Sequence, residues 1–201
     1  DRSQLGHRVL FDVADASSWQ TLLERRGLDA HHRETATIHV DGLPVGVTEY
    51  RKPRPHATLS AGDISGIDHL VFQAAGRDHA VALFGSTLGL DFRLDRHVDE
   101  GLRQLFFRAD DLIVEVLVTP NGLETTGRNL LAPPIALWGI AWATTDIEAS
   151  QTRLASAGFT VSQVRTGRKP DTRVATVRSP ALATRTLIIE PARSVTAKET
   201  S

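Results

Sequence analysis

Three stretches of the chain repeat one pattern: an apolar strand, a polar turn, a helix and a break at a glycine. The stretches that share this pattern are Gly6–Ala30, Asp68–Phe92 and Trp138–Val161. Glycine readily adopts the left-handed conformation that ends many helices, and each stretch has one at that place: Gly27, Gly89 and Gly158. A pattern that recurs along a chain is typical of a fold built by repeating one supersecondary unit. We therefore expect three related modules.

Each repeat continues into two strands joined by a turn, over residues 39–50, 107–118 and 177–192. Together these elements predict βαβββ modules and an α+β fold class. In the first module only Ala30–Glu34 separates the glycine break from the next strand, so we expect a partial βαββ module without a full second strand. The expected boundaries are 1–58 for this module and its linker, 59–120 for a middle module, 121–136 for a linker, 137–193 for a C-terminal module and 194–201 for a disordered tail.

Composition excludes several classes of function. The net charge of −1 gives no reason to expect binding to nucleic acid or to an anionic membrane. No apolar run approaches the roughly 18 residues of a membrane span. The chain has no cysteine, which rules out disulfides, thiolate nucleophiles and cysteine-bound zinc. Any bound metal must therefore have histidine and carboxylate ligands. We expect a cytoplasmic protein, although the absence of cysteine fits either compartment.

Two polar side chains interrupt apolar strands of the middle repeat. Alternation places His69 and Gln73 on one face of the first strand, and the face with Phe72 should cover the helix. Glu115 lies in the middle of the last strand. A carboxylate in an apolar setting needs a partner, because burying an unpaired charge is costly. From the residues alone that partner is a metal ion, a substrate or a neighbouring arginine.

The order and spacing of Asp68–Phe72, Leu88–Asp95 and Leu112–Val116 resemble the vicinal oxygen chelate superfamily. Its members include glyoxalase I, extradiol dioxygenases, fosfomycin-resistance enzymes and bleomycin-resistance proteins. The likeness covers residues 64–192 well and residues 5–53 weakly. It implies tandem modules that form a curved mixed sheet around a cleft, with a divalent metal held there by residues of first and last strands.

The resemblance assigns roles to single residues. His69 matches a first-strand ligand and Glu115 a last-strand ligand, and Glu190 takes the last-strand place in the C-terminal module. Gly139 stands where that module would have its first-strand ligand, and it has no side chain with which to bind a metal. One imidazole and two carboxylates would suit Zn, Ni, Mn or Fe. Gln73 and Gly139 would then lie beside the substrate.

A basic hairpin follows the third helix. Residues 164–178 carry five cationic side chains and one acid. Guanidinium groups grip carboxylates and phosphates with paired hydrogen bonds, so we expect Arg165 and Arg173 to bind a small anionic or oxygen-rich substrate. The alternative is a solvated hairpin whose charges are balanced by nearby acids.

Two functions remain open at this point. In an enzyme, the metal would polarise two adjacent oxygens of a small substrate, and Glu190 would move a proton. This favours isomerase or lyase chemistry of the glyoxalase type over oxygenation, because the second histidine of a usual iron triad is missing. The alternative is a metal-free protein of the bleomycin-resistance type that sequesters a ligand, which Gly139 favours. A third interpretation treats the extra N-terminal module as an interaction element that covers a sheet edge or swaps into a partner subunit. We expect it to dock in cis or across a homodimer.

Overall fold

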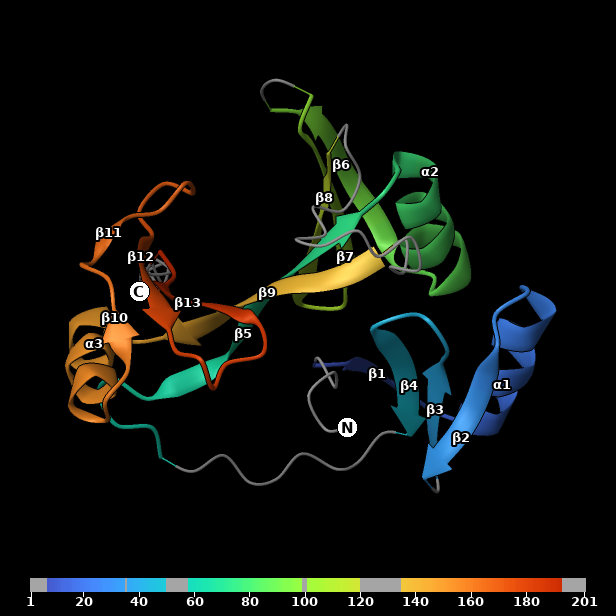
Figure 1. The fold of residues 1–201 in the computed structure, drawn as a ribbon, viewed down its shortest axis with the longest axis horizontal. Helices are drawn as coiled ribbons and strands as arrows, with labels where there is room; N and C mark the ends of the chain where they lie inside the picture. The colour runs from blue at the N-terminus through green and yellow to red at the C-terminus, as the bar shows by residue number, and fades with distance from the viewer. Residues whose placement is uncertain (1–6, 35, 50–57, 99–100, 120–134, 193–201) are drawn as a thin grey trace, which may run out of the picture. The chain divides into compact units, whose positions relative to one another are not determined.

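The computed structural model describes residues 7–34, 36–49, 58–98, 101–119 and 135–192 (Figure 1). The chain divides into two compact units. Unit 1 comprises Asp1–His56 and His69–Gly139, and unit 2 comprises Ala57–Asp68 and Ile140–Ser201. The predicted linker at 121–136 lies outside the described residues up to position 134, and strand β9 already begins at Ile135. The predicted tail at 194–201 also lies outside them.

The first module is a complete βαβββ unit. Its elements are β1 (Val9–Val13), α1 (Ala16–Arg25), β2 (Ala30–Glu34), β3 (Thr37–Val40) and β4 (Val45–Glu49). They form a sheet in the order β1-β4-β3-β2, with β1 parallel to β4 and the other pairs antiparallel. The prediction of a missing second strand was wrong, because the polar segment at 30–34 pairs with β3 as an edge strand.

The middle module repeats this topology. It consists of β5 (Ile64–Ala74), α2 (Arg77–Ala80), the π-helical turn η2 (Val81–Thr87), β6 (Asp91–His97), β7 (Arg103–Ala109) and β8 (Leu112–Val118). Strands β5 and β8 are parallel, as β1 and β4 are. Three fully buried aromatic rings pack between helix and sheet: Phe84 lies 4.9 Å from Phe72 and 5.5 Å from Phe107, centroid to centroid. This packing fixes one face of the sheet as the helix face.

The C-terminal module comprises β9 (Ile135–Thr144), α3 (Ile147–Ser156), β10 (Thr160–Val161), β11 (Arg165–Thr166), β12 (Arg173–Arg178) and β13 (Arg185–Glu190). Its α3 face buries Ile147, Ala175, Val177 and Ile188. Val174 and Ile189 alternate with them and pack with Ala141 on the other face. The nine strands from β5 to β13 follow the order β10-β12-β13-β9-β5-β8-β7-β6, with β11 beside β12.

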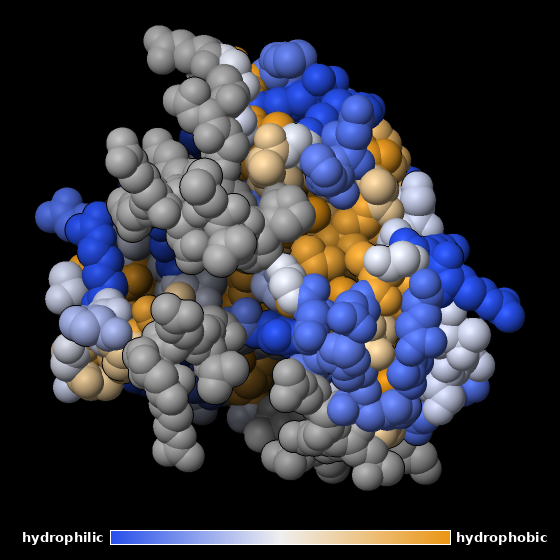
Figure 2. All heavy atoms as spheres, turned by 45° about the vertical axis from the view of Figure 1, so that its right-hand side comes forward, coloured by the Kyte–Doolittle hydropathy of each residue, from blue (hydrophilic) through white to orange (hydrophobic). Residues whose placement is uncertain are grey.

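The predicted α+β class, with mixed sheets assembled from βαβββ modules, is confirmed. None of the helices in the described part of the chain is long and apolar enough to cross a membrane. Apolar side chains reach the surface beside charged ones on the face that Figure 2 shows. The large apolar residues that stay exposed include Leu10, Phe92 and Leu94.

Candidate functional site

His69 and Glu115 lie on the same face of two neighbouring strands in unit 1. In the parallel pair β5–β8, His69 stands opposite Ile113 and Val71 stands opposite Glu115. Paired residues point to the same side of a sheet, so the imidazole and the carboxylate share a face at an offset of two residues. Ordinary strand spacing and rise put their Cα atoms roughly 8 Å apart. The opposite face carries the buried Phe72 and the helix. Both side chains therefore lie on the face away from α2.

A hydrogen-bond chain orients the carboxylate of Glu115. The Gln104 amide donates to Glu115 Oε1 at 2.6 Å, and Arg96 Nε donates to Gln104 Oε1 at 2.9 Å. Arg96 also lies over the Phe106 ring, 5.4 Å from its centroid. Gln104 is only 1% exposed, so this amide is a fixed part of the sheet face. Gln104 and Arg96 were not predicted from the sequence. Gln104 shares with Phe106 the face of β7 that lies away from the helix.

The N-cap of each helix is a common reference point for comparing positions between modules. The N-cap residues are Asp15, Gly76 and Asp146. Counting back seven residues from the second and third of these leads to His69 and Gly139. By this count Gly139 takes the first-strand position that His69 occupies in the middle module, and its part in a site stays a prediction.

The same comparison separates Glu190 from Glu115. Glu190 Oε2 accepts a hydrogen bond of 3.0 Å from the N–H of Ile147, the first residue of α3. Glu49 Oε1 accepts the corresponding hydrogen bond of 3.4 Å from the N–H of Ala16, the first residue of α1. These two glutamates are thus equivalent to each other. The middle-module residue at their position is Val118, which stands opposite the strand end as Glu49 does. Glu115 lies three residues earlier, at a place equivalent to Gly46 and Leu187.

The contacts of Glu190 are those of a scaffold residue. Its carboxylate lies on the α3 face, where it stands opposite Arg173 in the β12–β13 ladder and is 2.6 Å from Arg173 Nη2. Glu148 of α3 also pairs with Arg173. Glu190, and after it Glu148, raise the pKa of the Arg173 guanidinium. This placement argues against Glu190 as a metal ligand or proton carrier and against Arg173 as a substrate clamp. Both roles stay predictions.

The remaining candidates differ in their surroundings. Gln73 stands opposite Leu117, on the same face as His69 and Glu115. Arg165, in the short strand β11, has an exposed side chain and stands opposite Val174. Of the predicted set, the structure thus brings together His69, Glu115 and Gln73 on one face of unit 1.

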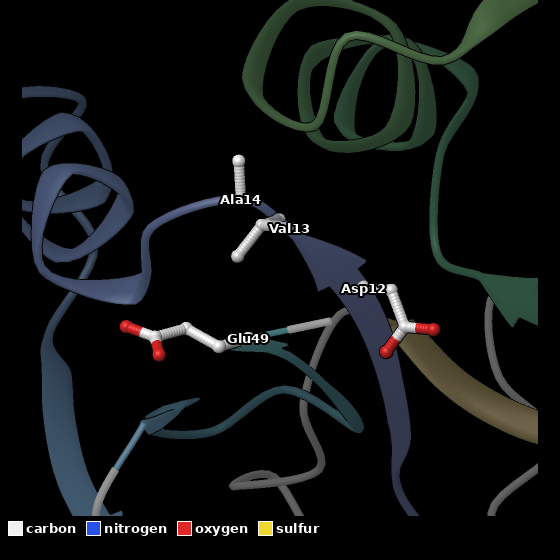
Figure 3. Close-up of a pocket in the computed structure, with 4 residues that line it drawn as sticks. All are labelled: Asp12, Val13, Ala14 and Glu49. Atoms are coloured by element: carbon white, nitrogen blue, oxygen red, sulfur yellow. The ribbon is translucent and has the colours of Figure 1, made fainter. Parts of the chain in front are cut away.

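Two further charged features have structural explanations. Asp95 lies between Arg103, whose Nη2 is 2.8 Å away, and Arg77, whose Nε is 2.8 Å away. The Arg103 hydrogen bond, and then that of Arg77, hold the pKa of Asp95 at about 2. Elsewhere, an open depression in the first module is lined by Asp12, Val13, Ala14 and Glu49 (Figure 3). Figure 3 shows the two carboxylates pointing away from each other, so they do not converge on one ligand.

Comparison with known proteins gives one family match and several related folds. The family model described as Glyoxalase/Bleomycin resistance protein/Dioxygenase superfamily matches residues 68–176. A methylmalonyl-CoA epimerase from Mycobacterium tuberculosis is 18% identical with a TM-score of 0.51, and the alignment covers 68% of this chain and 94% of the epimerase. A mutant 4-hydroxymandelate synthase from Streptomyces coelicolor is 16% identical with a TM-score of 0.61, over 91% of this chain and 70% of that one. The search of curated proteins found no match.

Proposed function

Because the chain belongs to the glyoxalase/bleomycin resistance protein/dioxygenase superfamily, we propose that the face of β5, β7 and β8 away from α2 binds a small oxygen-rich or anionic ligand together with a divalent metal. His69 and Glu115 would hold the metal. The observation that carries the proposal is the Gln104–Glu115 hydrogen bond of 2.6 Å, in which a fully buried amide fixes a carboxylate on the same face as an imidazole.

The two donors suit a borderline divalent ion such as Zn, Ni, Mn or Fe. An imidazole nitrogen and a carboxylate oxygen are fewer protein ligands than the four of a closed structural zinc site, so coordination positions remain for water or substrate oxygens. Such an ion would supply charge stabilisation to two adjacent substrate oxygens. The chain's own contribution is orientation. Gln104, itself held by Arg96, keeps the Glu115 carboxylate from turning away.

For the enzyme reading we propose isomerase or lyase chemistry rather than oxygenation. One of the similar folds is named an epimerase. The C-terminal module has Gly139 at the position of His69, so it supplies no second imidazole for an iron triad there.

A metal-free ligand-binding function is the second candidate, and a specific observation favours it. At the two positions equivalent to His69 and Glu115, the C-terminal module has Gly139 and Leu187, neither of which has a donor atom in its side chain. A protein that only sequesters a ligand needs no complete ligand set. Leu187 packs against the buried cluster of Ala141, Val174 and Ile189, so the place equivalent to Glu115 is apolar in the C-terminal module.

Calorimetric titration with Ni²⁺, Zn²⁺ and Mn²⁺ tests the metal. We expect His69→Ala and Glu115→Ala each to weaken binding at this site by at least about 10-fold, since even outer hydrogen-bond partners of a metal site are worth about 10- to 100-fold. Gln104→Leu should weaken it less than either ligand change. His79→Ala is the matched control, because His79 is an exposed imidazole on α2 and should not affect the titration.

Binding of all three ions by both ligand variants as in the parent would contradict the metal proposal. In that case a ligand screen on chelator-treated protein separates the alternatives. Compounds that stabilise the metal-free protein would favour the sequestering function, and their loss of effect in Gln104→Leu would place them on this face.

A further inference from the structure

The β2–β3 hairpin of the first module and the residues beside it carry four histidine and aspartate side chains that the proposed function does not use. They are Asp29, His31, His39 and Asp41. His31 stands opposite His39 in the antiparallel ladder. The N–H of Asp41 donates to the Asp29 carbonyl at 2.9 Å, which continues the ladder beyond the Ala30–Val40 pair. Alternation then places all four on one face.

This face lies away from helix α1. Ala30 and Val40 alternate with the four polar residues and are buried, 3% and 1% exposed, on the side that α1 covers. The side chains of Asp29, His31 and Asp41 are 78%, 42% and 51% exposed to solvent, so a hydrated ion can reach them. The first module thus presents a two-by-two array of histidines and aspartates to solvent.

The distances in the array match a metal site. His31 Nε2 is 2.9 Å from Asp41 Oδ2 and 3.7 Å from Asp29 Oδ1, and one ligand atom from each of the three residues lies within 4.8 Å of the others. Ligand atoms about 2.0–2.2 Å from one zinc ion lie at most roughly 4.4 Å apart. Small side-chain rotations therefore bring the three donors onto one ion.

Electrostatics gives the array a reason to take up a cation. Asp29 and Asp41 stand opposite each other just beyond the paired strands, and His31 Nε2 lies near a carboxylate oxygen of each. A divalent ion bound beside the imidazole would make attractive contacts with both carboxylates. The imidazole nitrogen selects Zn²⁺, Co²⁺ or Ni²⁺ over Mg²⁺ and Ca²⁺, which prefer oxygen ligands.

We infer that Asp29, His31 and Asp41 form a divalent transition-metal site. The ion would link the edge strand β2 to the residue that follows β3, and so stabilise the first module. The inference does not rest on the proposed function, because neither His69 nor Glu115 takes part in it.

The test is calorimetric titration with Zn²⁺, performed on the full chain carrying His69→Ala so that the other proposed site is disabled. We expect His31→Ala in this background to weaken the remaining Zn²⁺ binding by at least about 10-fold, because even residues that only hydrogen-bond to a metal ligand change the affinity by about 10- to 100-fold. His32→Ala is the matched control, because it removes the neighbouring imidazole of the same strand, which points to the opposite face. It should leave the affinity unchanged.

One further variant adds an independent readout. Asp29→Asn removes an exposed carboxylate without threatening the fold, and it should reduce the Zn²⁺-induced rise in melting temperature. Equal Zn²⁺ affinity in His31→Ala, His32→Ala and their parent would overturn the inference. So would the loss of all Zn²⁺ binding on His69→Ala alone, an outcome that would still support the proposed function.

Discussion

Replacing Glu190 by glutamine should destabilise unit 2 and leave metal binding intact. In the structure the Glu190 carboxylate is 12% exposed, pairs with Arg173 at 2.6 Å and accepts the first N–H of α3 at 3.0 Å. Glutamine has nearly the same size and keeps a carbonyl oxygen for that N–H. The substitution therefore removes the charge and little else.

The expected cost follows from those two contacts. Hydrogen bonds to charged groups contribute about 1.5–3 kcal/mol and neutral ones about 0.5–1.5 kcal/mol, a difference of roughly 1 kcal/mol that solvent reduces here because Arg173 is 43% exposed. A negative charge at a helix N-terminus adds about 0.3–1 kcal/mol. We expect a loss of about 1–2 kcal/mol, or roughly 2–8 °C in melting temperature for a chain of this size.

Urea unfolding followed by tryptophan fluorescence measures this loss, since Trp142 packs on the core cluster beneath α3. Glu148→Gln is the matched control. It removes the other acidic partner of Arg173, but this side chain is 56% exposed, so the cost should be under about 1 kcal/mol. Unchanged stability in Glu190→Gln, accompanied by a tenfold loss of Ni²⁺ affinity, would refute the scaffold role and restore Glu190 as a ligand.

The pKa of Asp95, held at about 2 mainly by Arg103, lies below its unfolded value near 3.9, so its stabilisation is present above about pH 4 and is lost as pH falls toward 2. Asp95→Asn should lower the free energy of unfolding by about 1–2 kcal/mol at pH 7. It should also reduce the fall in melting temperature between about pH 4 and pH 2, and an unchanged fall would contradict this role of Asp95. Gly139→His should tighten Ni²⁺ binding in calorimetry, and no gain would mean that this position does not face the metal. Arg165→Ala should weaken an anionic ligand by roughly 10-fold while Arg173→Ala mainly lowers the melting temperature, and the reverse pattern would restore the Arg173 clamp.

The modular architecture could be predicted because its signals are local and repeated. Each strand, helix and glycine break occurs three times, and the family match over residues 68–176 confirms the resemblance that those pieces carry. Strand β2 could not be recognised, since Ala30–Glu34 is a short polar edge strand without the alternation that marks a half-buried strand. Its pairing with β3 depends on the tertiary ladder. The predicted homodimer stays a prediction.

The candidate site was predictable in part. His69 and Glu115 stand out as polar side chains inside apolar strands, and alternation placed them on the right face. Glu190 looked equivalent to Glu115 because both are glutamates in last strands. Glu190 accepts a hydrogen bond from the first N–H of its helix, however, and the middle-module residue at that place in the strand is Val118, three residues after Glu115. Gln104 gave no signal, because a glutamine in a strand is common and only the hydrogen bond to Glu115 reveals its part.

The most direct test of the central proposal is anomalous diffraction at the nickel edge from crystals grown with Ni²⁺. We predict a peak about 2.0–2.6 Å from a His69 ring nitrogen and a Glu115 carboxylate oxygen, with Gln104 still bonded to that carboxylate. A separate peak at the β2–β3 hairpin would be a second site and would leave this prediction standing. Density for Ni²⁺ only elsewhere, with the face of His69 and Glu115 occupied by water at saturating metal, would contradict the account.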